Sequence, residues 1–269
     1  MEIVIESYAA IGVANGAAGE QAQVWLPPGY TLTGGGAYDL GRGSANVLTS
    51  CYPIRDHQGV YNGWAAAGRD PLPLAVYAIG IKVTRGGVPV KVEQNVFCAS
   101  SALVPEPGVS ARLGPGWIGT GGGAMDNCAG RAGANVLTSS YPLIGTDGRI
   151  CGWSATGKDP SQAEPARVTA FVIGIRGADG VALDAQIVSN SSMMTGFPSV
   201  MVTAPRGKAV VAGGGALRER NAHGQMLSAT CPVISSRDGR LTGWYAARKV
   251  MRAAAPGAIT AYSVMLEAA

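Results

Sequence analysis

The chain has few charged residues and no long apolar run, and each shortage removes a class of protein. Charged residues make up 14% of the 269 residues, against an average of about 25%, which excludes long salt-bridged helices. Gly, Asn, Arg or Asp interrupts every apolar stretch before the roughly 20 residues of a membrane-spanning helix. The start Met1–Glu6 carries acids where a secretory signal needs bases. We therefore expect a soluble protein that is cytoplasmic, or released without a classical signal peptide.

Metal ligands and catalytic bases are also scarce. The five cysteines contain no C-x-x-C pair, and their odd number does not suit a complete disulfide framework. The two histidines, His57 and His223, lie in loop-like segments without repeated counterparts. Zinc sites need closely spaced Cys and His, and calcium loops need spaced acids. The sequence therefore predicts no metal site, no cofactor and reduced, mostly structural thiols.

Glycine and apolar residues are abundant instead. The chain has 40 Gly, 16 Pro and 47% hydrophobic residues, a composition of short strands joined by tight turns. Pro28-Gly29 and Pro115-Gly116 indicate turns. Asp147-Gly148 and Asp238-Gly239 precede matching strands and are predicted hairpin tips. The sequence predicts an all-β protein.

A threefold internal repeat organises the chain. Gly34–Ala37 recurs as Gly121–Ala124 and as Gly213–Ala216, at offsets of 87 and 92 residues. Each copy is followed by a Leu-containing segment that ends in Pro, then by a Gly-Trp pair and a closing apolar run. We predict a single domain, 1–269, built from units of about 90 residues: 1–85, 86–177 and 178–269.

Unit length selects among threefold architectures. A β-trefoil has units about half as long, whereas about 90 residues allow five or six strands each. A closed, pseudo-threefold prism of three sheets fits better, with the three Gly-Gly-Gly runs in equivalent strands near its axis. We expect the terminal strands, 2–8 and 259–266, to pair with each other and so close the ring.

The repeat resembles one found in poorly characterised bacterial and fungal proteins. The resemblance rests on Gly29–Ala37, Asn46–Pro53, Trp64 with Arg69-Asp70, and Ala75–Ile81, and it extends through unit two and more loosely through unit three. That repeat has Lys-Asp-His after the Trp segment, whereas Pro71 and Pro160 stand at the His position here. No settled activity comes with the resemblance. Threefold β-prisms are often lectins, and this analogy concerns the fold alone.

The candidate binding residues follow each repeated Trp. An aromatic face beside charged groups suits a sugar, whose C–H face packs on the ring while its hydroxyls meet Asp and Arg. The residues are Trp64, Arg69 and Asp70; Trp153, Lys158 and Asp159; and Trp244 and Lys249. The loops after each Gly-Gly-Gly-Ala add Asp39 and Asp126 as candidates. The alternative interpretation is that each Trp packs in a sheet core and each charged pair ties a turn.

Two charge patterns offer further alternatives. Glu6 and Glu93 occupy matching places in units one and two, and Asp184 lies close to the third such place. They are candidate catalytic carboxylates or, more simply, charges on edge strands. Residues 204–252 hold nine bases and two acids, but their spacing predicts no nucleic-acid binding.

Three functions of different classes remain. We expect a lectin-like protein with up to three quasi-equivalent sites for a glycan or another small polar ligand. A toxin-like or structural interaction protein and an enzyme with one site in a diverged unit are the alternatives. A homo-oligomer is compatible with each.

Overall fold

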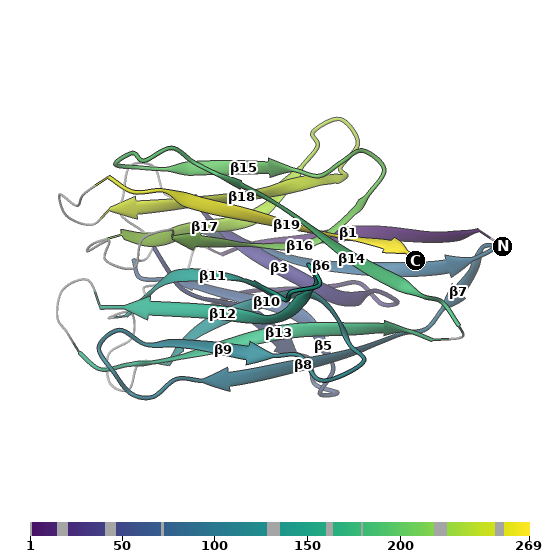
Figure 1. The fold of residues 1–269 in the computed structure, drawn as a ribbon, viewed down its shortest axis with the longest axis horizontal. Coiled ribbons are helices and arrows are strands. Elements are labelled where there is room, and N and C mark those ends of the chain that lie inside the picture. Colours follow the sequence, from purple (N-terminus) through teal and green to yellow (C-terminus); the bar gives the residue numbers. More distant parts are fainter. Residues whose placement is uncertain are drawn as a thin grey trace.

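The structure is a computed structural model that describes residues 2–14, 21–40, 47–70, 73–127, 135–159, 164–178, 180–217, 225–250 and 256–269. Within these ranges it contains 19 strands and no helix. The strands form three antiparallel sheets of roughly equal size, consistent with the predicted threefold repeat. Most strands run along the long axis of the molecule, and both termini lie toward the same end (Figure 1).

Each sheet has a path of six strands, and we call the sheets I, II and III. Sheet I has the order β1 (Ile3–Ala14), β6 (Leu74–Arg85), β3 (Thr31–Asp39), β17 (Gln225–Ile234), β18 (Leu241–Val250) and β15 (Ser199–Thr203), with β7 (Val88–Val90) pairing with β6. Sheet II has the order β2 (Gln21–Trp25), β5 (Tyr61–Gly68), β4 (Leu48–Arg55), β10 (Ile118–Asn127), β13 (Arg167–Gly177) and β8 (Val92–Ser100). Sheet III has the order β14 (Leu183–Ser191), β19 (Ile259–Ala268), β16 (Ala209–Leu217), β11 (Val136–Ile144), β12 (Ile150–Lys158) and β9 (Gly108–Arg112).

The six-strand path of every sheet combines strands from two units. In sheet I, three strands of unit one join three strands of unit three. In the same pattern, sheet II combines units two and one, and sheet III combines units three and two. The units meet at short pairings, such as Ala37 with Thr230 between β3 and β17. The predicted pairing of the two terminal strands is wrong, because β1 pairs with β6 and β19 pairs with β14 and β16. The first and last units meet through β3 and β17 instead.

The glycine runs lie in the equivalent strands β3, β10 and β16, but the third run is offset by one residue. The sequence match aligns Gly213 with Gly34, whereas strand pairing places Gly213 opposite Ser263, as Gly35 lies opposite Ala78. Ala212 therefore takes the place of Gly34 and Gly121. The three strands come so close here that there is space for only one methyl group. A Cβ on Gly121 would lie 2.7 Å from the Ala212 Cβ, so when Ala212 supplies the methyl group the other two positions must be glycine.

Tight turns explain how short strands follow each other. Gly148 and Gly239 have φ values of 79° and 72° and lie between β11 and β12 and between β17 and β18. The predicted hairpin tips are thus confirmed, and positive φ is the reason for glycine there. Buried apolar side chains from all three sheets form one continuous core cluster.

Candidate functional site

The three repeated tryptophans are core residues. Trp64, Trp153 and Trp244 have 0% exposed surface. A Cβ on Gly35, Gly122 or Gly213 would overlap the respective indole ring, so each ring packs on a glycine. The predicted role of these indoles as sugar platforms is wrong, because no face of them is open to a ligand.

Each buried indole N–H has a partner on the neighbouring strand. Trp64 donates to Cys51 Sγ at 3.1 Å, Trp153 to Ser140 Oγ at 2.9 Å and Trp244 to Thr230 Oγ1 at 2.8 Å. The three acceptors occupy equivalent positions in β4, β11 and β17. Since a buried N–H without a partner is costly, this position needs a polar or sulfur-containing side chain in every unit.

The charged candidates lie where two units meet. Lys249 at the end of β18 forms an ion pair with buried Asp39 at the end of β3, so the structure joins residues from two separate predicted groups. Arg69 and half-buried Asp126 hold the corresponding positions in sheet II. Asp70 is half-buried and Asp159 is buried. A binding role for these side chains stays a prediction.

Sheet III departs from this arrangement. Leu217 holds the position of Asp39 and Asp126, and Lys158 forms its ion pair with Glu106, 2.8 Å away. Glu106 lies in the segment between β8 and β9 and its side chain is 63% exposed. The replacement of an acid by leucine changes the chemistry of this one junction.

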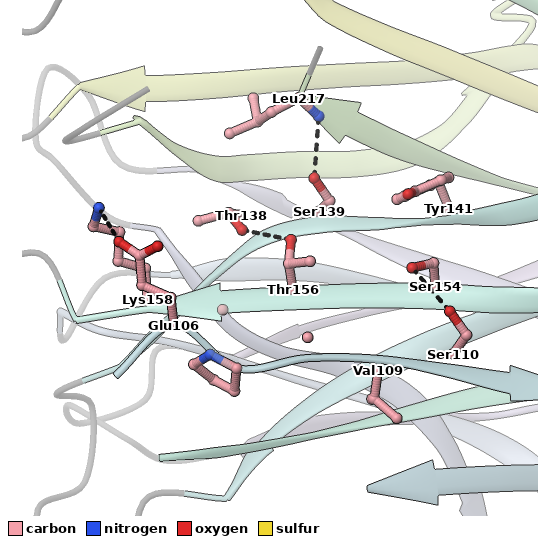
Figure 2. Close-up of a pocket in the computed structure, with 13 residues that line it drawn as sticks. Glu106, Val109, Ser110, Thr138, Ser139, Tyr141, Ser154, Thr156, Lys158 and Leu217 are labelled. Atoms are coloured by element: carbon pink, nitrogen blue, oxygen red, sulfur yellow. Dashed lines mark hydrogen bonds and ion pairs between the residues drawn. The ribbon is translucent and has the colours of Figure 1, made fainter. Parts of the chain in front are cut away.

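A groove of about 590 Å³ opens at this junction, on the outer side of β9, β11 and β12 (Figure 2). The Lys158–Glu106 pair lies near one end of the view and Tyr141 near the other. Six of its thirteen lining residues carry hydroxyl groups: Ser110, Thr138, Ser139, Tyr141, Ser154 and Thr156. This is the candidate functional site of the described residues.

The hydroxyls are held in place by bonds between strands. Thr138 Oγ1 and Thr156 Oγ1 are 2.6 Å apart, and Ser110 Oγ donates to Ser154 Oγ at 3.4 Å. Ser139 Oγ accepts from the Leu217 backbone N–H at 3.1 Å. A hydroxyl both donates and accepts and carries two lone pairs, so these groups can make further bonds toward a ligand from fixed positions.

Two of the hydroxyl positions of the groove differ in the other sheets. Ser154 and Thr156 are the first and third residues after the buried Trp of sheet III. The corresponding residues are Ala65 and Ala67 in sheet II and Tyr245 and Ala247 in sheet I. Sequence reasoning missed the groove because it followed what the units share. The available signal was the opposite one: Ser154 and Thr156 stand in unit two where unit one carries alanine at both positions.

A separate hollow, of about 480 Å³, contains an accessible tryptophan. Trp117 is half-buried and lies beside Asp147 and Arg149 in this hollow. The Arg176 guanidinium lies 4.7 Å from the centre of the Trp117 ring and pairs with Glu93. Arg149 pairs with Asp184 at 2.9 Å. Protein groups already engage the ring and both arginines, which makes this hollow the weaker candidate.

The three repeated acids are on edge strands, as one interpretation of the sequence predicts. Glu6, Glu93 and Asp184 lie on β1, β8 and β14, each the end strand of its sheet path. Glu6 accepts a 2.6 Å hydrogen bond from the Tyr30 hydroxyl. This bond, with burial second, raises the pKa of Tyr30 to about 12. Each acid thus has a partner within the protein.

The basic residues of 204–252 do not share one kind of surface. Arg248 is buried, and Lys208 forms an ion pair with Glu267. Arg237 and Arg240 are exposed next to the β17–β18 turn. His57 is exposed between β4 and β5. His223, Arg218, Arg220 and Arg252 lie outside the described residues.

Searches for other functional signatures return little. No group of three or more His, Cys, Asp or Glu side chains in the described ranges could hold a metal ion. No helix in the part of the chain that the structure describes is long and apolar enough to cross a membrane. The chain matches no protein-family model and no curated protein.

Proposed function

We propose that the protein is a carbohydrate-binding, lectin-like protein whose main site is the groove of sheet III. The observation that carries the proposal is the set of six hydroxyl groups that line this groove. Sugars present many hydroxyls that donate and accept, and a fixed array of protein hydroxyls is complementary to them. The groove volume, about 590 Å³, is within the range of small-ligand sites.

A closed, pseudo-threefold β-prism is the proposed architecture. Three sheets of similar size and the cyclic exchange of strands between units support it. Contacts between the edge strands β1 and β2, β8 and β9, and β14 and β15 join neighbouring sheets at their margins. Such an arrangement provides a rigid scaffold for binding residues on its outer faces.

We propose one main site and not three equal ones. Alanine at positions 65 and 67 removes two of the hydroxyls from sheet II, and Ala247 removes one from sheet I. The Asp39–Lys249 ion pair further changes the junction in sheet I. Binding to sheet III alone would give one site per chain, so any avidity would need a second copy of the chain.

A glycan array followed by titration of the best binders tests the proposal. Ser110→Phe fills the groove from an exposed position of β9, and Gln23→Phe makes the matched change at the equivalent exposed position of β2. We expect Ser110→Phe to lower glycan affinity at least tenfold and Gln23→Phe to leave it within twofold. If Trp117→Ala abolishes binding while Ser110→Phe does not, the site is the Trp117 hollow.

One observation favours a second function, contact with a membrane or an apolar partner. Met193, Met194 and Phe197 in the β14–β15 loop are 85%, 59% and 74% exposed. Large apolar side chains clustered at a surface often mark an interaction site. Leakage of a dye from liposomes by the full chain, lost in a Met193→Ser/Met194→Ser/Phe197→Ser variant, would support this toxin-like alternative.

A further inference from the structure

We infer that sheet III binds an extended, uncharged oligosaccharide that crosses its strands from β9 to β14. This inference rests on the proposed carbohydrate-binding function and specifies the ligand of the same face. It concerns the length, the direction and the charge of the ligand. Each of these follows from a separate observation.

The groove does not end at Tyr141. A second hollow, of about 330 Å³, adjoins it and shares Tyr141 and Leu217 with it. Its other lining residues come from β14, β16 and β19: Ser189, Ser191, Ala216, Thr260 and Tyr262. Together the two hollows reach residues of all six strands of sheet III, so the recessed surface extends across the whole sheet.

The hydroxyl pattern continues across the second hollow. Ser191 Oγ and Thr260 Oγ1 are 2.8 Å apart, much as Thr138 and Thr156 are joined in the first. Neighbouring strands lie about 4.8 Å apart, so six strands extend over about 24 Å. One strand spacing is similar to the length of one pyranose ring in an extended chain. A linear glycan lying across the strands would therefore meet a new hydroxyl group at nearly every residue.

Two tyrosines lie where the hollows meet. The rings of Tyr141 and Tyr262 have centroids 6.1 Å apart and planes inclined by 20°, and both side chains are half-buried. The two rings are stacked, and the outer face of the stacked pair can pack against the C–H face of a sugar. Unlike the buried Trp153, this aromatic surface is open to a ligand.

The lining charges indicate an uncharged ligand. Only Lys158 and Glu106 among the residues that line the two hollows carry a charge, and they form an ion pair with each other. Their charges cancel, so the surface has no excess of either sign with which to attract a uronic acid or a sulfated sugar. Neutral hydroxyl groups are the complementary partners.

The test is a titration of the full chain with linear gluco-, xylo- and manno-oligosaccharides of two to six residues, with oligogalacturonides as charged probes. We expect affinity for one neutral series to rise at least tenfold from two to five residues and then to level off. Equal affinity for the disaccharide and the hexasaccharide would overturn the extended site and leave the proposed function standing. Preference for the charged series would overturn the neutral-ligand inference. Absence of binding to all of them, together with a blank glycan array, would refute the proposed function itself.

Variants in the second hollow locate the ligand. Ser191→Phe blocks this hollow from an exposed position of β14, and Ser100→Phe is its matched control on β8 of sheet II. We expect Ser191→Phe to remove the gain from chain length while disaccharide binding persists, and Ser100→Phe to change neither. Circular dichroism melting of each variant shows whether it folds. A folded Ser191→Phe protein with full affinity for the pentasaccharide would contradict the proposed direction of the chain.

Discussion

Separate alanine substitutions of Gly213 and Gly215 in β16 test the register at the centre of the fold. A Cβ on Gly213 would overlap the Tyr262 carbonyl oxygen and the Trp244 ring, and neither a backbone nor a fully buried indole can move away. A Cβ on Gly215 would lie 3.1 Å from the Ala246 Cβ and the Leu227 Cδ1, which are side-chain atoms. Ala37 and Ala124 already occupy the equivalent positions of β3 and β10.

The two variants should therefore differ widely. Overpacking costs about 1–3 kcal/mol or more, and with two immovable neighbours we expect Gly213→Ala to lose at least about 3 kcal/mol. Gly215→Ala should stay within about 1 kcal/mol of wild type, because the loss of unfolded-state freedom offsets a tight contact. Urea unfolding followed by tryptophan fluorescence measures both. Equal damage by Gly215→Ala would refute this register, since the sequence match places Gly215 beside a backbone carbonyl, as Gly36 is.

Three further predictions concern the same interior. Gly34→Ala should lower the melting temperature, because its Cβ would overlap the Ala212 methyl; adding Ala212→Gly should restore most of the loss, and a failure of rescue would show that the two do not compete for one space. Thr33 Oγ1 donates to the Val211 carbonyl at 2.9 Å, and Thr120 Oγ1 donates to the Thr33 carbonyl at 3.0 Å. Val211→Thr adds a third hydroxyl that can donate to the Thr120 carbonyl, so we expect it to raise the unfolding free energy by up to about 1 kcal/mol. A loss of about 1 kcal/mol or more in urea unfolding would mean that the new hydroxyl finds no acceptor. Burial raises the pKa of the Cys51 thiol from about 9 to about 12, so the stability that the neutral thiol contributes is complete below pH 9 and is lost as pH rises through 12. Cys51→Ser should therefore lessen the fall in melting temperature between pH 9 and 12. An unchanged alkaline profile of the variant would exclude this thiol as the cause.

The sequence predicts the all-β fold class and the hairpin tips because both depend on residues that are close together in the chain. Asp-Gly pairs favour tight turns with positive φ at glycine, and Gly148 and Gly239 adopt it. Strand partners depend on distant residues instead. Nothing in the pattern of β1 says that it pairs within its own unit, or that β3 pairs with a strand about 190 positions later.

The candidate site could not be predicted from the repeat, because it depends on differences between units and on which side chains are exposed. A Trp that recurs in every unit satisfies a need common to all units, and here that need is packing on a glycine. The proposed site instead depends on residues that differ among units, such as Ser154 and Thr156. The exposure of the Tyr141 and Tyr262 rings also could not be predicted from the sequence, because it depends on neighbouring residues of β16 and β19.

The pairing of β3 with β17 has a consequence for synthesis on the ribosome. About 190 residues separate Ala37 from Thr230, so at 5–20 residues per second β3 waits about 10–40 s for its partner. During that time its outer edge carries Gly34, Gly35 and Gly36, which have no side chains to block pairing with a foreign strand. An unguarded edge of this kind invites association between nascent chains. The last strands to be made therefore protect the first, and the speed of elongation through residues 40–230 sets how long this edge of β3 stays unpaired.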